Sequence, residues 1–295
     1  MSNVLTSTKV LDLVGLSSLM ELNSGMPEVV VGLFDGPVVM DHPNLSENLR
    51  EAPGVVGGGC SQASSTACLH GTFVAGILSA RRGSQAPSIC PGCTLLIHPL
   101  FKETSPSSGM MPNVTPEELS EAIIESVNAG AWVLNLSAAF SEPSTRGEHT
   151  LEKALNYAAR HQVIVVAAAG NQGTLGSSAI TRYPWVIPVV GCNLHGSPTN
   201  ESNLGSSVGK RGLMAPGESI TSLRAEGALI TLGGTSVAAP FVTGCIALLW
   251  SMFPSASATD VKSAVTGGYA RRRASIVPPL LDAKVAYEAM VKFGS

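Results

Sequence analysis

Three residues of this chain have the types that acyl transfer requires, and they occur in the order Asp35, His70, Ser236. A serine hydroxyl is a weak nucleophile at neutral pH, so a histidine must take its proton during attack. A buried carboxylate must then hold the imidazole in the right tautomer and stabilise the imidazolium. The sequence therefore predicts a catalytic site with Ser236 as nucleophile, His70 as base and Asp35 as the residue that orients the base.

The surroundings of Ser236 predict how negative charge would be stabilised. Ser236 opens a long apolar run that reaches residue 253 and predicts a buried helix. At the first turn of a helix, unpaired N–H groups and the positive dipole end converge, which would stabilise an oxyanion. Asn171 follows a predicted strand, and its side-chain N–H completes a predicted oxyanion hole with the Ser236 backbone. Pro240 cannot donate to the Ser236 carbonyl, so we expect a loosened first turn.

These residues need a scaffold, and predicted strands alternate with predicted helices along the chain. Strands are expected at 29–34, 94–98, 132–136, 163–168, 186–190 and 229–233. Helices are expected at 3–20, 70–78, 115–130, 149–161, 236–253, 258–266 and 282–291. The alternation predicts an α/β fold whose parallel sheet is covered by helices on both faces. Asp35 then lies at the carboxyl end of a strand, the usual place for function in such a sheet.

Length and composition limit the possible classes of protein. With 295 residues, 44% of them hydrophobic, and no repeat or linker, we expect one domain over 1–295. Residues 1–27 would form a helical extension, and the core would run over about 28–290. A net charge of −3 argues against nucleic-acid binding. The apolar run at 237–250 is too short and too interrupted to span a membrane. Residues 1–20 show no secretory signal, which predicts a cytoplasmic location.

Four of the six cysteines, Cys60, Cys68, Cys90 and Cys93, have spacings that permit disulfides. Cys60 and Cys68 bracket a short serine-rich loop, and they could pair with each other or with the other two. Without a secretory signal, reduced thiols are expected, although the local spacings leave two disulfides open. Cys90-Pro-Gly-Cys93 has the form of a metal or redox motif, but a second C-x-x-C is missing and this one precedes a strand. We therefore expect no metal site and no required cofactor.

Four blocks of sequence, in order, resemble those of the subtilisin-like serine proteases, the subtilase family. The Asp, His, oxyanion and Ser blocks of that family match residues 29–45, 70–76, 165–173 and 234–240. The order of the three catalytic types is that of subtilisin. Weaker likenesses occur at 135–137, 215–217 and 280–283. The resemblance implies a three-layer subtilisin-like fold, serine endopeptidase activity and a peptide substrate; nothing in the sequence indicates a structural calcium site.

Two departures from the family pattern bear on the site. The chain has Asp35-Gly36-Pro37 where the family usually has Asp-Ser/Thr-Gly, which removes a hydroxyl beside the carboxylate. After Ser137 the family usually carries glycines that admit the substrate backbone, whereas this chain has Ala138-Ala139-Phe140. The added methyl groups should narrow the subsites, so we expect a small or unusual residue before the scissile bond.

The resemblance also implies that the peptide binds as an added strand between edges at about 105–110 and 135–139. The candidate substrate-binding residues are Ser108, Gly109, Ser137, Ala138, Ala139, Gly170 and Thr235. A rival pair, Asp41 and His42, is disfavoured because adjacent side chains rarely face one another productively. The remaining histidines are expected to be structural or exposed: His98, His149, His161 and His195.

Among subtilases, the chain is most similar to the protease domains of cyanobactin biosynthesis. The likeness rests on the Asp-Gly-Pro departure, the cysteine-rich segments and the short spacing between Asp35 and His70. It implies removal of the leader from a ribosomal precursor peptide. The macrocyclising relative carries a helical insertion that shields the acyl-enzyme from water, and no helical pattern occurs between Asp35 and His70.

No pro-region of family size is expected before residue 28. The alternatives are a macrocyclase of this kind, a general intracellular protease, an inactive peptide-binding fold and a thiol-based redox or metal module.

Overall fold

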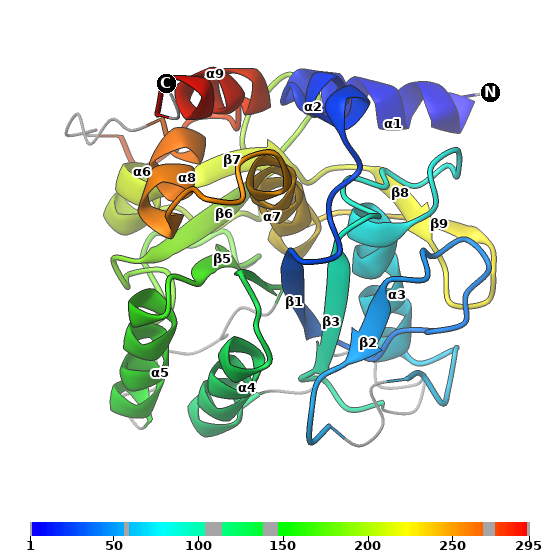
Figure 1. The fold of residues 1–295 in the computed structure, drawn as a ribbon, viewed down its shortest axis with the longest axis horizontal. Helices are drawn as coiled ribbons and strands as arrows, with labels where there is room; N and C mark the ends of the chain where they lie inside the picture. Colours follow the sequence, from blue (N-terminus) through cyan, green and yellow to red (C-terminus); the bar gives the residue numbers. More distant parts are fainter. Residues whose placement is uncertain (1, 56–58, 104–113, 138–146, 268–274, 294–295) are drawn as a thin grey trace.

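The computed structural model describes residues 2–55, 59–103, 114–137, 147–267 and 275–293. At its centre lies a seven-stranded sheet in the order β2-β3-β1-β4-β5-β6-β7, with every pair parallel and helices on both faces (Figure 1). The strands of this sheet are β1 (Val30–Asp35), β2 (Leu49–Glu51), β3 (Thr94–Pro99), β4 (Val133–Leu136), β5 (Ile164–Ala168), β6 (Val186–Cys192) and β7 (Leu213–Pro216). The predicted three-layer α/β fold is confirmed.

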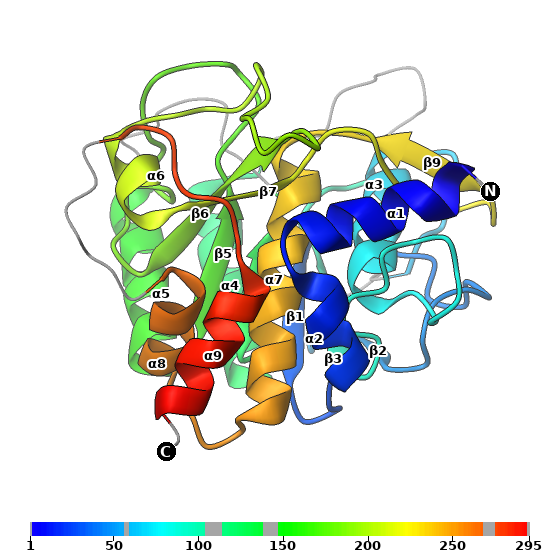
Figure 2. The same cartoon turned by 90° about the horizontal axis from the view of Figure 1, so that it is seen from above.

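Two sets of helices cover the two faces of the sheet. One face carries α4 (Pro116–Asn128) and α5 (Glu148–Arg160), whose apolar sides bury residues such as Leu134 and Val165. The other face carries α1 (Ser2–Leu13), α2 (Leu16–Leu22), α3 (Thr66–Ser79), α7 (Thr235–Met252), α8 (Ala258–Val265) and α9 (Ala283–Phe293). Figure 2 shows α1, α2 and α9 on the side of the molecule where α7 lies. A short helix, α6 (Ser206–Arg211), lies beside β6.

Helix α7 is the central helix of the fold and packs against β1 and against the strands from β4 to β7. The expectation that this apolar run is too short to span a membrane is wrong by length and composition alone, because the helix has a mean hydropathy of 1.5 over 18 residues. However, 94% of that window is buried inside the fold. A helix that is hydrophobic all round is what the core of an α/β protein requires. The apolar run is therefore accounted for by burial within the protein.

Several expected elements differ from those in the structure. The single helix expected at 3–20 is wrong, because the chain turns at Gly15 between α1 and α2 with φ of 70°. Glycine adopts this left-handed conformation at little cost. The segment at 229–233 does not join the central sheet: β9 (Leu229–Leu232) pairs antiparallel with β8 (Ile220–Leu223) in a separate sheet. The short elements β2, β7, β8 and α6 were not predicted, since runs of 3 to 6 residues carry too little periodicity.

Candidate active site

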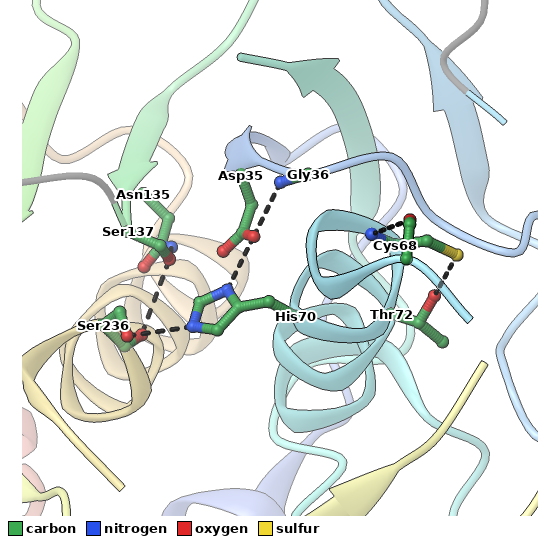
Figure 3. Close-up of polar contacts among 9 residues, drawn as sticks. Asp35, Gly36, Cys68, His70, Thr72, Asn135, Ser137 and Ser236 are labelled. Carbon is green, nitrogen blue, oxygen red and sulfur yellow. Dashed lines mark hydrogen bonds and ion pairs between the residues drawn. The ribbon is translucent and has the colours of Figure 1, made fainter. Parts of the chain in front are cut away.

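Asp35, His70 and Ser236 come together at the carboxyl edge of the sheet, each from a different element (Figure 3). Asp35 is the last residue of β1, His70 lies on α3, and Ser236 is the second residue of α7. The Nδ1 atom of His70 lies 2.7 Å from Asp35 Oδ1, and its Nε2 atom lies 3.0 Å from Ser236 Oγ. These distances suit transfer of a proton from the serine to the imidazole, with the carboxylate behind the ring.

The carboxylate of Asp35 is fully buried and is held from one side only. Its Oδ1 atom accepts hydrogen bonds from the Gly36 backbone N–H, at 2.7 Å, and from His70. Its Oδ2 atom has no hydrogen-bond partner among the described residues. A Cβ at Gly36 would lie 2.0 Å from the backbone oxygen of Ala67. The departure from Asp-Ser/Thr-Gly therefore has a steric cause, because α3 packs too closely for any side chain at position 36.

His70 is not the first residue of its helix, so the expected helix start is wrong. Helix α3 begins at Thr66, one turn earlier, because Ser65 caps it and accepts a hydrogen bond from the Cys68 N–H at 3.1 Å. This capped first turn belongs to the segment that was expected to be loop. A disulfide joins Cys60 to Cys68, with a Cα–Cα distance of 5.6 Å. The base is thus presented by the second turn of a helix whose first turn is cross-linked to the preceding loop.

The charge balance around His70 favours its protonated form. Burial of the ring lowers the pKa of His70, but the charge of Asp35 and their hydrogen bond outweigh it, so the pKa is raised above its ordinary value. The imidazole side chain is 17% exposed, whereas the Asp35 side chain is fully buried. A buried carboxylate in hydrogen-bond contact stabilises an imidazolium as it forms. The pair is therefore suited to accept a proton from Ser236 and hold it for a leaving group.

Ser236 occupies the first turn of α7, where backbone N–H groups lack helical acceptors. Gly234 precedes the helix with φ of 124°, and a Cβ there would lie 3.0 Å from the Asn171 side-chain nitrogen. Both the backbone conformation and this close approach require glycine. The helix continues through Pro240, so the proline removes a hydrogen-bond donor without ending the helix.

Asn171 is oriented by Thr235. The Asn171 side-chain oxygen accepts hydrogen bonds from the Thr235 backbone N–H at 2.8 Å and from its hydroxyl at 2.9 Å. The same hydroxyl accepts from the Gly170 N–H at 3.1 Å. Within the described part of the chain, the Asn171 side-chain nitrogen donates to no partner, so its N–H groups are available to an oxyanion. Thr235 was predicted as a substrate-binding residue. Its side chain is fully buried here and holds the segment that contains Gly170 and Asn171.

The other predicted substrate-binding residues are only partly described. Ser137 follows β4 and is 7% exposed, with its hydroxyl directed toward the backbone of Ser236 (Figure 3). Gly170 lies beside Asn171 with φ of 105°, and a Cβ there would meet the side chain of Asn203 at 2.3 Å. Ser108, Gly109, Ala138 and Ala139 lie outside the described residues, as does the expected narrowing of the subsites around them.

The rival pair, Asp41 and His42, is not assembled. His42 is buried, and both of its ring nitrogens contact backbone groups: Nδ1 accepts from the Asn44 N–H at 3.1 Å, and Nε2 lies 3.2 Å from the Arg224 oxygen. Asp41 is exposed. Buried His98 stacks on Phe34, and burial lowers its pKa to about 4. The remaining histidines, His149, His161 and His195, are exposed.

The expectation of reduced thiols is wrong for Cys60 and Cys68, and the structure has free thiols at Cys90 and Cys93. Cys60 and Cys68 are bonded to each other, whereas Cys90 and Cys93 are buried free thiols. One group of potential metal ligands occurs among the described residues, formed by the two bonded sulfurs and Glu103, with all three ligand atoms within 4.8 Å. A sulfur in a disulfide is not a thiolate, so this group does not provide thiolate ligands in its bonded state.

Two polar residues beside the site were not recognised as part of it. Asn135 in β4 and Thr243 in α7 are fully buried, and the Thr243 hydroxyl donates to the Asn135 side-chain oxygen at 2.8 Å. Their signal in the sequence was the presence of an amide and a hydroxyl within two otherwise apolar runs. Buried polar groups require partners. Such interruptions of an apolar run are therefore candidates for a network.

Comparison with known proteins identifies the family. The sequence model of the subtilase family matches residues 27–269, and the chain belongs to this family of subtilisin-like serine proteases. A thermostable alkaline protease of Halalkalibacterium halodurans is 29% identical over 66% of this chain and 51% of that protein. Subtilisin DY of Bacillus licheniformis is 30% identical over 80% of this chain and 81% of that protein. The chain spans about half the length of the first two curated relatives it matches.

Solved structures give a more specific likeness. The prenylagaramide maturation protease PagA is 29% identical, with a TM-score of 0.79 over 94% of this chain and 98% of that chain. The protease domain of PatA is 28% identical, with a TM-score of 0.81 over 92% of this chain and 98% of that chain. The chain is thus similar to these two proteases over more than nine tenths of its length.

Proposed function

We propose that this chain is a serine endopeptidase that removes the leader from a ribosomally made precursor peptide of the cyanobactin type. The observation that carries the proposal is the hydrogen-bonded line from Asp35 through His70 to Ser236, with distances of 2.7 and 3.0 Å. The likeness to PagA and PatA, which extends over more than nine tenths of both chains in each case, supports a precursor peptide as substrate.

The proposed reaction runs through an acyl-enzyme. Ser236 Oγ attacks the carbonyl carbon of the scissile peptide bond, while His70 Nε2 takes the hydroxyl proton. The Asn171 side-chain N–H and the Ser236 backbone N–H stabilise the oxyanion. His70 then gives its proton to the leaving amine, which departs with the core peptide. A water molecule, deprotonated by the same imidazole, hydrolyses the ester to release the leader with a new carboxyl end.

We infer hydrolysis rather than cyclisation from the segment between Asp35 and His70. An amine competes with water for an acyl-enzyme only where water is excluded. The described residues of this segment contain β2 and the first turn of α3, and no further helix that would cover the serine. The PatG macrocyclase, at 19% identity, shares the fold and supports no closer assignment.

The test is intact mass spectrometry of precursor peptides with varied leader–core junctions, incubated with the wild type and with Ser236→Ala. Cleavage at one junction, lost in Ser236→Ala, is the expected result. In water labelled with oxygen-18, the leader should gain one labelled oxygen at its new carboxyl end. A fluorophosphonate probe of serine hydrolases should label the wild type and not Ser236→Ala.

Three outcomes would contradict the proposal in different ways. A cyclic product that lacks one water would replace hydrolysis with cyclisation. Cleavage of many unrelated peptides would leave the serine protease in place and remove its precursor specificity. An unlabelled wild type would indicate an inactive fold that only binds peptides, and labelling that persists in Ser236→Ala would overturn the assignment of the nucleophile.

A further inference from the structure

We infer that Asn135, together with Ser137 and Thr243, forms a buried hydrogen-bond chain that positions the nucleophile Ser236. The inference rests on the proposed function, because it assigns residues that act through Ser236. The hydrogen bonds of these three side chains run to one another and to the Ser236 backbone, and not to the His70 imidazole or the Asp35 carboxylate. They are therefore positioning residues, which act by fixing the position of the Ser236 hydroxyl.

The chain of contacts begins with a carbonyl that α7 does not satisfy in the usual way. In an α-helix, the Ser236 carbonyl would accept the N–H of residue 240, but Pro240 has none. The Ser137 hydroxyl lies 3.5 Å from this oxygen and supplies a donor (Figure 3). At 3.5 Å this contact is at the long end of the range for a hydrogen bond. A buried carbonyl without a donor is costly, so the hydroxyl has a defined task here.

Asn135 determines the direction in which the Ser137 hydroxyl donates. The Asn135 side-chain nitrogen donates to Ser137 Oγ at 2.9 Å, and its oxygen accepts from the Thr243 hydroxyl at 2.8 Å. Because Ser137 Oγ already accepts from the amide, its own proton is left for the Ser236 carbonyl. The reversed amide would take the Ser137 proton for itself and leave that carbonyl without it. With the Thr243 hydroxyl donating to its oxygen, Asn135 has the orientation that serves Ser236.

The periodicities of strand and helix explain why these four residues meet. On β4, side chains two residues apart share a face, and Val133 belongs to the same cluster as α7, whereas Leu134 and Leu136 belong to the opposite one. Asn135 therefore faces α7. On α7, Ser236 and Thr243 are seven residues apart, about two turns, and share one side of the helix. The network thus pins α7 against β4 at two points of an otherwise apolar interface.

The consequence for catalysis follows from the anchored atom, which belongs to the nucleophile itself. A rotation of the first turn of α7 that moved the Ser236 carbonyl would also move its Oγ, which lies 3.0 Å from His70 Nε2. Misplacement by about 1 Å can cost on the order of a hundredfold in rate. We therefore expect loss of the network to slow acylation while leaving substrate binding nearly unchanged.

The test compares Thr243→Val with Thr243→Ser, a matched pair in which one variant loses the hydroxyl and the other keeps it. The rate of labelling by a fluorophosphonate probe is measured per active site, and kcat and KM are measured separately on a leader–core peptide. Thr243→Val and Ser137→Ala should each lower the labelling rate and kcat about tenfold or more. Thr243→Ser should remain close to the wild type, and KM should change little in all of them.

Two controls separate positioning from stability. Ile246→Val removes a methylene from the same helix outside the network, so it should lower Tm without changing kcat per active site. The double variant Ser137→Ala/Thr243→Val should be no slower than the slower single variant, because both act through one chain of contacts. The acidic limb of the pH profile should stay in place, since the contact between His70 and Asp35 is untouched.

Several results would overturn the positioning role. Equal labelling rates for Thr243→Val and Thr243→Ser would do so. Multiplicative effects on the rate in the double variant would also do so. A kcat in Ile246→Val as low as that of Thr243→Val would show that destabilisation alone lowers the rate. These results require that the wild type reacts with the probe. A wild type that does not react would instead remove the proposed function and, with it, the inference that depends on it.

Discussion

The two helices that carry His70, the proposed base, and Ser236, the proposed nucleophile, are held in place by different means. Helix α7 is buried along nearly its whole length, and its first turn is fixed from inside the protein by Thr235, Asn171 and the network through Asn135. Helix α3 is also apolar, but its first turn is half-buried at Thr66 and Leu69 and is fixed by the buried Ser65 cap and by the disulfide from half-buried Cys60. The nucleophile therefore depends on the core, and the base depends on a cross-linked loop.

Because the two helices are held by different contacts, we expect different perturbations to displace them. Close backbone contact adds to the hold on α3, since a Cβ at Gly71 would lie 2.3 Å from the Gly36 oxygen. The loop before it is held by Glu103, which accepts from the Gln62 N–H at 2.7 Å. A disulfide responds to reductant and the exposed contact of Glu103 responds to solvent, whereas buried polar networks respond to changes in the core.

The largest effect on kcat should come from removing the side chain of either Ser236 or His70. Ser236→Ala and His70→Ala should each lower kcat by about a millionfold, a magnitude known for the corresponding losses in subtilisin. Because the two residues act as one unit, the double variant should be no slower than either single variant. Single-turnover kinetics on a leader–core peptide would measure this. A further large loss in the double variant would show that the helices contribute independently.

The next largest effect should come from Asp35→Asn, which lowers kcat by about 10⁴ because the imidazole loses its orienting carboxylate. In the wild type, His70 must be neutral to accept a proton, so kcat/KM should rise with pH through its pKa. Asp35 raises that pKa above the ordinary value of 6.5, and the midpoint should lie above it as well. In Asp35→Asn the midpoint should move to lower pH. An unmoved acidic limb would mean that another group controls it.

Gly36→Ala tests the close packing on the base side. The added methyl group would lie 2.0 Å from the Ala67 oxygen, so α3 must shift. Overpacking of this kind costs about 1–3 kcal/mol of stability. The shift should also move His70 away from Ser236, so kcat should fall while KM changes little. Gly176→Ala is the control, because a Cβ at Gly176 meets nothing within 4 Å. Equal kinetics for the two variants would show that α3 tolerates displacement.

The smallest effect on activity should come from the disulfide. The double variant Cys60→Ser/Cys68→Ser should lose about 2–3 kcal/mol of stability, the amount that closing a loop of this size confers on entropic grounds. Its kcat/KM should fall less than that of Gly36→Ala, because the Ser65 cap and the contact at Gly36 remain. Thermal unfolding with and without dithiothreitol would measure the effect. Reductant should lower Tm of the wild type and not of the double variant, and a wild type indifferent to reductant would contradict the cross-link.

Sequence alone determined the class of fold and nominated Asp35, His70 and Ser236 as the catalytic residues. Buried parallel strands and apolar helices are long continuous patterns, so β1, β3, β4, β5 and β6 were placed from local signals. The helix expected at 115–130 also begins at a local signal, a capping box in which the Glu118 N–H donates to the Thr115 hydroxyl at 3.1 Å. Asp35, His70 and Ser236 were nominated because each stands in a short motif whose chemistry is specific to its residue types.

Tertiary structure alone decided what depends on contacts between distant segments. The pairing of Cys60 with Cys68, rather than with Cys90 or Cys93, depends on which thiols approach one another. The glycine at position 36 is explained only by the backbone of α3 lying against it. The role of Asn135 required β4 and α7 to pack face to face, since a hydrogen-bond partner 108 residues away leaves no local pattern. Local patterns specify elements and reactive side chains, whereas the contacts that orient those side chains exist only once the chain has folded.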